Sequence, residues 1–208
     1  MIPLVKRKNI NYLAHLLLSG NNPKIKVGNF IGDFIKGKQY ETLDPMIGKG
    51  VLLHREIDFY TDNHAIVALS KDRLREKYRH YSGVIVDMFY DHYLAKNFEL
   101  YSSTHLTDFA QMSYQIVESY WDVIPPRGQK MLPYMIRGNW LVNYGKREGI
   151  HRALQGLSRR TKFDSKLEYA IQDLQEFDSE FESEFMSFFK EIEVHISKFR
   201  EDLINSSQ

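Results

Sequence analysis

Histidine and aspartate occur at helical spacing in one short segment of the chain. His54 and Asp58 are four residues apart, so in a helix both side chains project from the same face, about 6 Å from each other. An imidazole and a carboxylate at that separation are suited to bind one divalent metal ion. Asp62 continues the same stripe by another turn. We therefore predict a metal-dependent centre here, with Asp58 and Asp62 as candidate general bases.

A second segment repeats this arrangement. Asp87 and Asp91 are again four residues apart, and His92 follows directly, which widens the same helical face by about 100°. Asp33 and His15, on two further predicted helices, would complete a ligand set drawn from four helices, as in the metal sites of helical bundles. Imidazole and carboxylate ligands favour manganese, then iron, zinc or magnesium. The predicted metal ligands are His15, Asp33, His54, Asp87, Asp91 and His92.

These residues also have ordinary structural interpretations. A single histidine on an apolar helix face, such as His15, is commonly a hydrogen-bonded core residue, and Asp62 can simply end a helix. Arg55 is either a solvated helix residue or, beside a metal, a bidentate partner for phosphate. A salt-bridge network among the other histidines and aspartates would need several basic residues, and only Arg55 is close in the sequence. The metal interpretation is therefore favoured.

The positions of apolar residues predict the helices that carry these side chains. Apolar residues recur at steps of three and four, whereas strand-like alternation does not persist. Asn11 is expected to cap the first helix and Ser82 the most apolar one, while Gly32 allows close backbone approach beside Asp33. The predicted helices cover residues 11–19, 27–37, 44–63, 83–95, 104–121 and 129–145, and residues 163–203 form one long helix or two in series.

Composition indicates a globular, all-α protein. The chain has 208 residues, of which 43% are hydrophobic and 26% charged, so we expect one helical domain over residues 1–208. Lys and Arg (28) nearly balance Asp and Glu (27), which argues against nucleic acid as a partner. Cys is absent, which excludes disulfides and thiolate ligands. No segment reads as a membrane span or a cleaved leader, so a cytoplasmic location is expected.

The candidate residues lie in short segments that follow one another in a recognisable order. These segments are Asn11-Tyr-Leu-Ala-His15, Gly28-Asn-Phe-Ile-Gly-Asp33-Phe34, His54-Arg-Glu-Ile-Asp58 with Thr61-Asp62, and Asp87 with Asp91-His92-Tyr-Leu-Ala95. This order resembles the acyl carrier protein phosphodiesterase family. The similarity continues through Trp140-Leu141 to Arg159-Arg160 and the C-terminal helix. Residues 1–10 precede the family's usual start and are interpreted as an N-terminal extension, and the adjacent pair reads Asp-His where the pattern expects His-Asp.

The resemblance implies a fold and a reaction. The family is a divergent relative of the His-Asp (HD) phosphohydrolases, helical enzymes that use a divalent ion, commonly manganese. An HD-like helical bundle with a long C-terminal helix is therefore expected. Family members release 4'-phosphopantetheine from the serine of holo acyl carrier protein, which restores the apo form. On this interpretation a metal-activated water attacks phosphorus, and Arg55 offsets the charge that grows on the phosphoryl oxygens.

Two other functions fit the same residues. One keeps the metal centre but acts on a nucleotide or alarmone, as better-known HD phosphohydrolases do. The other is a non-catalytic helical interaction module, in which the histidines and aspartates form a buried polar network and the long C-terminal helix is the docking face. A module of this kind should bind no stoichiometric metal ion, so metal analysis separates it from both enzymes.

Recognition of a protein substrate would need a local basic surface, because the chain as a whole is almost neutral. The carrier protein implied by the resemblance is small, helical and strongly acidic. Several basic residues fall in the segments that carry Asp33 and His54, and we expect them to form a positive rim around the site; ordinary solvated lysines are the alternative. These basic residues are Lys24, Lys26, Lys36, Lys38, Lys49 and Arg55.

Overall fold

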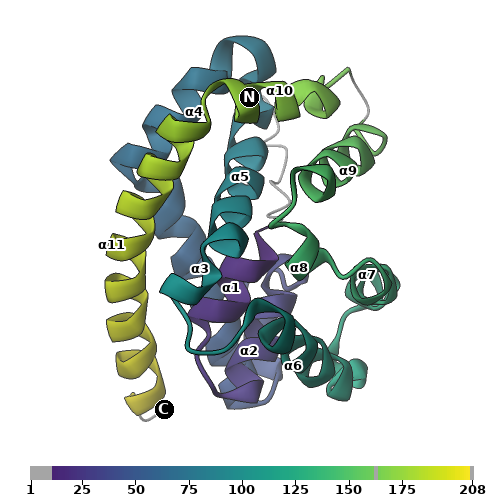
Figure 1. Cartoon of the computed structure of the whole chain (residues 1–208). Coiled ribbons are helices and arrows are strands. Elements are labelled where there is room, and N and C mark those ends of the chain that lie inside the picture. Colours follow the sequence, from purple (N-terminus) through teal and green to yellow (C-terminus); the bar gives the residue numbers. More distant parts are fainter. Residues whose placement is uncertain (1–10, 162–163, 207–208) are drawn as a thin grey trace.

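The computed structural model describes residues 11–161 and 164–206, and within these ranges the chain contains helices and no strand. Figure 1 shows the helices packed around a central α5, with the long α11 along one side and α7 on the other. The predicted all-α fold class and the long C-terminal helix are thereby confirmed. Residues 1–10, which carry the predicted N-terminal extension, lie outside the described ranges. None of the described helices is both long and apolar enough to span a membrane.

The second and third helices begin where the sequence supplies capping groups. α1 (Tyr12–Leu18) is followed by α2 (Pro23–Ile31), whose N-cap Asn22 accepts hydrogen bonds from the backbone N–H groups of residues 24 and 25. α3 (Pro45–Asn63) begins in the same way, because the Asp44 side chain accepts from the N–H of residue 46. Both helices have proline at their first position, where its fixed φ fits and no N–H is needed.

Glycines allow α2 and α3 to cross in direct backbone contact. A Cβ atom on Gly28 would lie 2.0 Å from the carbonyl oxygen of Ile47, and one on Gly50 would lie 2.3 Å from that of Ile25. No larger residue fits either position, since such separations are far inside van der Waals contact. This close crossing fixes α2, and the short 3₁₀ helix that continues it (Gly32–Phe34), against the middle of α3.

The centre of the fold is α5 (Ser82–Lys96), of which all residues except Val84 and Lys96 are buried. α4 (Ala65–Tyr78) and α11 (Asp178–Asn205) pack against it. Aromatic rings of α5 meet rings of α11 edge to face at favourable separations. The prediction that Ser82 caps this helix is wrong: Tyr81 takes the N-cap position, and Ser82 is already helical.

The remaining helices form the other side of the molecule. α6 (Leu106–Ser119) confirms the predicted helix over residues 104–121. The predicted helix over residues 129–145 is instead two helices, α7 (Pro126–Arg137) and α8 (Trp140–Asn143). Between them Asn139 adopts a left-handed φ of 41°, a conformation that asparagine tolerates and that ends the helical run. α9 (Arg147–Ser158) and α4 had no counterpart among the predicted helices.

The C-terminal segment follows the second of the two predicted alternatives, two helices in series. α10 (Ala170–Glu176) is separated from α11 by a single non-helical residue. The start of the predicted run, residue 163, lies outside the described ranges. The short 3₁₀ helices are Gly32–Phe34, Gln39–Thr42, Arg79–Tyr81, Phe98–Leu100, Trp121–Val123 and Leu167–Tyr169.

Candidate metal centre

Three of the predicted ligand or catalytic side chains meet at one point, and a fourth lies beside them. Nε2 of His15 lies 3.3 Å from one carboxylate oxygen of Asp58, and Nε2 of His54 lies 3.3 Å from the other. Nε2 of His54 is also 3.7 Å from Oδ1 of Asp33. α1, α3 and the 3₁₀ helix after α2 thus bring together four groups of the types that bind divalent metals. We call these four residues the metal cluster.

The spacing of these atoms fits a single ion. Ligand atoms about 2.1 Å from one metal ion lie about 3.0 to 3.5 Å from each other. Nitrogen and oxygen atoms from His15, His54 and Asp58 all lie within 4.8 Å of one another, and the shorter contacts match that range. Nε2 of His15 is buried and has no aligned hydrogen-bond partner, although such atoms are normally satisfied. The donor set therefore fits a bound cation.

Asn29 fixes the ring of His15. Its side-chain N–H₂ donates to the carbonyl oxygen of His15 and to the hydroxyl of Ser19, both at 2.9 Å. Oδ1 of Asn29 is then the acceptor 2.7 Å from Nδ1 of His15. This arrangement places the ring proton on Nδ1 and leaves the Nε2 lone pair facing the cluster, as in many metal sites. No role was predicted for Asn29 from the sequence, and its complete burial is seen only in the structure.

The ring of His54 is pressed against the backbone of Gly32. A Cβ atom at residue 32 would lie 2.2 Å from Cγ of His54, so the predicted close approach at this glycine is confirmed. Burial lowers the pKa of His54, but hydrogen bonding and charge from Asp33 and Asp58 outweigh it and raise that pKa to about 9. Burial alone would raise the pKa of Asp58. The two histidines lower this pKa by more than burial raises it, so the net shift is downward.

The cluster opens to solvent through its carboxylates. The side chains of His15 and His54 are 3% and 5% exposed, whereas those of Asp33 and Asp58 are 18% and 28% exposed. The two imidazoles form the floor, stacked with their ring centroids 4.3 Å apart. A ligand of the cluster would therefore approach from the side of the two aspartates.

The other two predicted catalytic residues are engaged elsewhere. Arg55 donates from Nη2 to the carbonyl oxygens of Ile35 and Gly37, at 3.3 Å and 2.7 Å, and its guanidinium lies over the ring of Tyr40. It holds the loop that follows Asp33. Asp62 accepts from the ammonium of Lys71 at 3.0 Å, one turn beyond the metal cluster.

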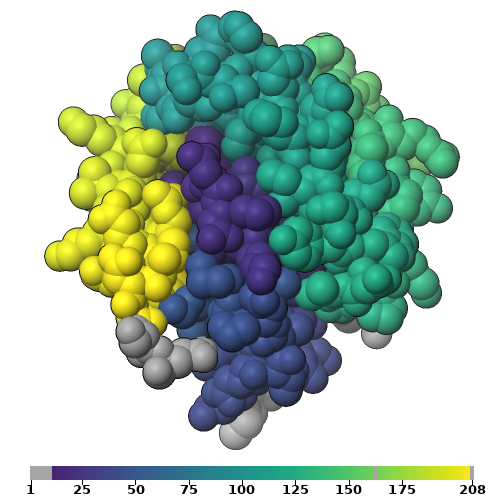
Figure 2. Space-filling model, turned by 90° about the horizontal axis from the view of Figure 1, so that it is seen from below, coloured from purple at the N-terminus to yellow at the C-terminus, as the bar shows by residue number. Residues whose placement is uncertain are grey.

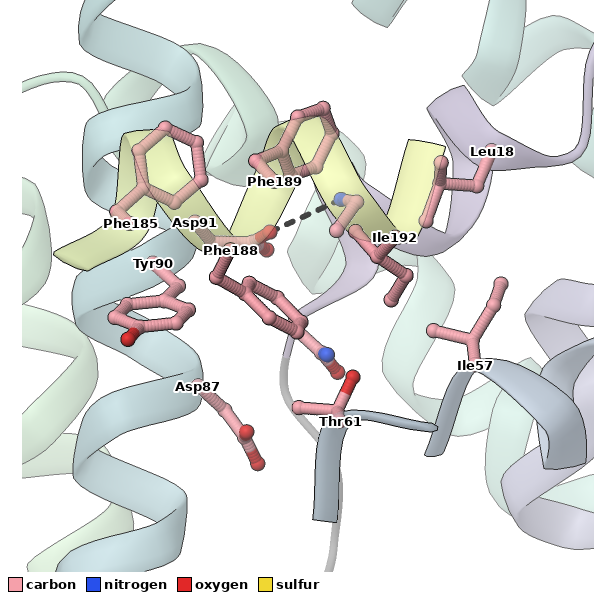
Figure 3. Close-up of a pocket in the computed structure, with 12 residues that line it drawn as sticks. Leu18, Ile57, Thr61, Asp87, Tyr90, Asp91, Phe185, Phe188, Phe189 and Ile192 are labelled. Atoms are coloured by element: carbon pink, nitrogen blue, oxygen red, sulfur yellow. Dashed lines mark hydrogen bonds between the residues drawn. The ribbon is translucent and has the colours of Figure 1, made fainter. Parts of the chain in front are cut away.

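Asp91 contacts the start of α1. Its two carboxylate oxygens accept hydrogen bonds from the backbone N–H groups of Leu13 and Ala14, at 2.9 Å and 3.0 Å. Figure 3 shows this contact at the wall of a small pocket. Asp91 thus supplies the capping group expected of Asn11, whose side chain makes no such bond. Burial raises the pKa of Asp91 well above its usual value, against the effect of the two N–H groups.

Asp87 and His92 also lie apart from the metal cluster. Asp87 lines the same pocket, which has a volume of about 20 Å³ and whose wall includes three phenylalanines of α11 (Figure 3). That volume holds about one water molecule and no substrate. Nδ1 of His92 donates to the carbonyl oxygen of Tyr144 at 2.7 Å, and burial lowers the pKa of this histidine. The structure therefore separates the three predicted ligands of α5 from the other three.

Two lysines of the predicted basic rim pair with acidic neighbours, and others contact neutral groups of the chain. Lys24 pairs with Asp44 at 2.7 Å, and Lys38 lies 3.6 Å from Glu41. Lys49 donates to two carbonyl oxygens at the end of α11. Lys26 is buried with its ammonium over the ring of Phe109, and burial lowers its pKa to about 8.

Comparisons with known proteins agree with the order of segments along the chain. The family model described as acyl carrier protein phosphodiesterase matches residues 10–192. The chain belongs to the acyl carrier protein phosphodiesterase family. It is 27% identical over 181 residues to the protein of that name from Photorhabdus laumondii, covering 86% of this chain and 91% of the relative. It is 29% identical to the protein of the same name from Klebsiella pneumoniae, and the match covers 88% of this chain and 95% of the relative. No solved structure matches.

The metal affinity of this family member should depend on pH through His54. A metal ion binds neutral imidazole, but in the metal-free protein the pKa of His54 is raised to about 9, so binding at pH 7 must displace its proton. Affinity for Mn²⁺ should therefore rise about tenfold per pH unit between pH 7 and 9 and level off above that. Calorimetry in buffers of different ionisation enthalpy should count about one released proton at pH 7. An affinity that is constant over this range contradicts the assignment of His54 as ligand.

Asp91→Asn should destabilise the family member without preventing it from binding added Mn²⁺. An amide presents only one acceptor oxygen, so one buried N–H of α1 loses its partner, at a cost of about 1–3 kcal/mol. Urea unfolding measures this loss, and metal analysis should give the wild-type stoichiometry. Asp72→Asn, which weakens an exposed ion pair with Arg75, is the matched control and should cost less than about 1 kcal/mol. Wild-type stability with metal lost would make Asp91 a ligand.

Proposed function

We propose that this protein is a metal-dependent phosphodiesterase that releases 4'-phosphopantetheine from the serine of holo acyl carrier protein. The observation that carries the proposal is the metal cluster: two imidazoles and two carboxylates converge on one point that opens to solvent. The family match supports the reaction class, and the name of the relatives supports the carrier protein as substrate. Manganese is the proposed ion, with magnesium, iron or zinc as alternatives.

The chain's own residues prepare the site for phosphate chemistry. A divalent ion held here supplies Lewis acidity toward a phosphoryl oxygen and toward water. His15, oriented by Asn29, and His54, confined by Gly32, present nitrogen lone pairs from the floor. The lowered pKa of Asp58 keeps its carboxylate charged near neutral pH. We therefore propose Asp58 as a ligand and, together with Asp33, as the boundary at which substrate and water enter.

Two arginines whose charges act on Tyr12, Arg127 and Arg160, are candidates to offset the negative charge that develops on phosphate. Burial raises the pKa of the Tyr12 hydroxyl; the charge of Asp33 raises it further, and those of Arg127 and Arg160 lower it. Asp33, Arg127 and Arg160 therefore all act on the Tyr12 hydroxyl, over the range of about 10 Å at which charges interact in salt solution. Because the guanidinium of Arg55 is bound to loop carbonyls, we propose Arg127 and Arg160 for the role predicted for Arg55.

The kinship to HD phosphohydrolases stays a prediction, and the ligand set proposed from the structure is smaller than that predicted. It comprises His15, Asp33, His54 and Asp58. Asp87, Asp91 and His92 are proposed to support the fold, since Asp91 caps α1 and His92 holds the carbonyl of Tyr144. Asp62 is paired with Lys71 and is not proposed as the general base.

The test is incubation of the purified protein with holo acyl carrier protein and Mn²⁺, followed by intact-mass analysis. We expect the carrier to lose the mass of its phosphopantetheine arm and to match apo carrier protein. A nucleotide and an alarmone, offered under the same conditions, should remain intact. Unchanged holo carrier alongside hydrolysed nucleotide would instead identify a nucleotide phosphohydrolase, and inactivity on all substrates without bound metal would favour the non-catalytic module.

A further inference from the structure

Charge is distributed unevenly over this nearly neutral chain. Residues 126–160, which form α7, α8 and α9, contain eight Lys and Arg residues and a single acidic residue, Glu148. α11 has the opposite character, with eight acidic residues and three basic ones. The two regions lie on opposite sides of the molecule (Figure 1). Seen from below, yellow α11 and the green segments flank the N-terminal helices (Figure 2). The molecule thus has a basic side and an acidic side, and a charged partner would be attracted to the side of opposite charge.

One face of α7 gathers exposed basic and aromatic side chains. Arg127, Lys130, Tyr134 and Arg137 follow one another at steps of three and four along this helix, and all are exposed. Lys130 and Arg137, together with Tyr134, line a shallow hollow. Among the residues that the structure describes, none of the three cations forms an ion pair. We call these four residues the α7 face.

The α7 face begins at the edge of the metal cluster. The first turn of α7 packs on the 3₁₀ helix that carries Asp33: a Cβ atom on Gly128 would lie 3.1 Å from the ring of Phe34. One turn on, the Tyr12 hydroxyl contacts Sδ of Met131 at 3.2 Å. From Met131 the helix runs about 9 Å further, to Arg137. A partner bound at the cluster could reach all of α7, because a standard interface buries about 800 Å² on each partner.

We propose that the α7 face docks an acidic helical protein, the carrier protein itself, so this inference rests on the proposed function. The bond to be cleaved joins phosphate to a serine on the carrier's own surface, so the carrier must lie against the enzyme at the metal cluster. Acidic side chains then meet Lys130 and Arg137, whose charges are not already neutralised, while Tyr134 supplies apolar contact area. Most residues of the previously predicted rim have intramolecular partners and are less available.

The test uses charge reversal with a matched control. Lys130→Glu combined with Arg137→Glu changes the α7 face without touching the metal cluster. Lys190→Glu combined with Lys198→Glu makes the same change in net charge on α11, where both lysines are exposed. Binding of labelled apo carrier protein is measured by fluorescence anisotropy, and turnover is measured on holo carrier protein and on bis(p-nitrophenyl) phosphate. Circular dichroism and thermal melting check that each variant is folded.

The α7 variant should weaken binding of the apo carrier and raise KM for the holo carrier by about tenfold, with kcat nearly unchanged. The same variant should hydrolyse the small diester at about the wild-type rate, and the α11 variant should resemble wild type throughout. Equal effects of both variants would show general attraction by net charge and overturn a specific face. Binding of a labelled single-stranded oligonucleotide, with no binding of the carrier, would overturn the proposal in favour of nucleic acid.

Failure of this inference differs from failure of the proposed function. If wild-type protein leaves holo carrier protein uncleaved, the proposed function fails, whatever the α7 variant does. If holo carrier protein is cleaved with the same KM by wild type and by the folded α7 variant, the function stands and the α7 face is excluded as the docking surface.

Discussion

His54→Ala should lower turnover of holo acyl carrier protein at least about a hundredfold while leaving helix content unchanged. The imidazole contributes a floor nitrogen to the metal cluster and lies within 4 Å of both carboxylates, so its removal leaves two acids to repel each other around a weakened ion. The measurements are kcat and KM on the holo carrier and the metal content of the purified variant.

Stability must be separated from catalysis in this experiment, because His54 is buried and its truncation leaves a cavity beside Gly32. Thermal melting in the presence of Mn²⁺ should therefore accompany the assay. His105→Ala is the matched control, since His105 is exposed and contacts only Glu99, and it should keep wild-type turnover. A folded His54→Ala protein that retains both its metal and near wild-type kcat would remove this residue from the centre.

Exhaustive chelation should abolish hydrolysis, and Mn²⁺ should restore it. The chain has no cysteine nucleophile, and the basic imidazole of His54 is held by two carboxylates, so the residues present offer little chemistry without an ion. Activity should fall at least about a hundredfold in protein shown by elemental analysis to be free of metal. The ion that restores the highest kcat/KM at stoichiometric loading identifies the favoured cofactor.

Metal return should also raise the melting temperature, because an ion that binds only the folded state stabilises it by about 2.7 kcal/mol at a hundredfold excess over Kd. This second readout does not depend on activity. His54→Ala should lose most of the melting shift, whereas Asp91→Asn should keep it. Full hydrolysis by metal-free protein would contradict the proposed mechanism even if Mn²⁺ stabilises the fold.

Local periodicity predicted the fold class and several helices because these depend on residues close in the sequence. Capping at Asn22 and Asp44 and the apolar stripe of α6 are local features of this kind. The break in the predicted helix over residues 129–145 depends on a left-handed Asn139, which periodicity does not reveal. The charged helix α4 was not predicted either. Only a narrow face of it is buried, and that face includes polar residues, so its apolar periodicity is weak.

For the candidate site, the sequence by itself determined that His54 and Asp58 share a helix face and that Gly32 permits close contact, because both follow from backbone geometry. The same spacing rule also paired Asp87 with Asp91, but an i, i+4 relation does not say what the face meets. Tertiary packing decided that: α1 presents its free N–H groups to Asp91, whereas α1 and α3 bring His15 to Asp58. Long-range contacts, set by which helices cross, separated a carboxylate that caps α1 from one that lies beside two histidines.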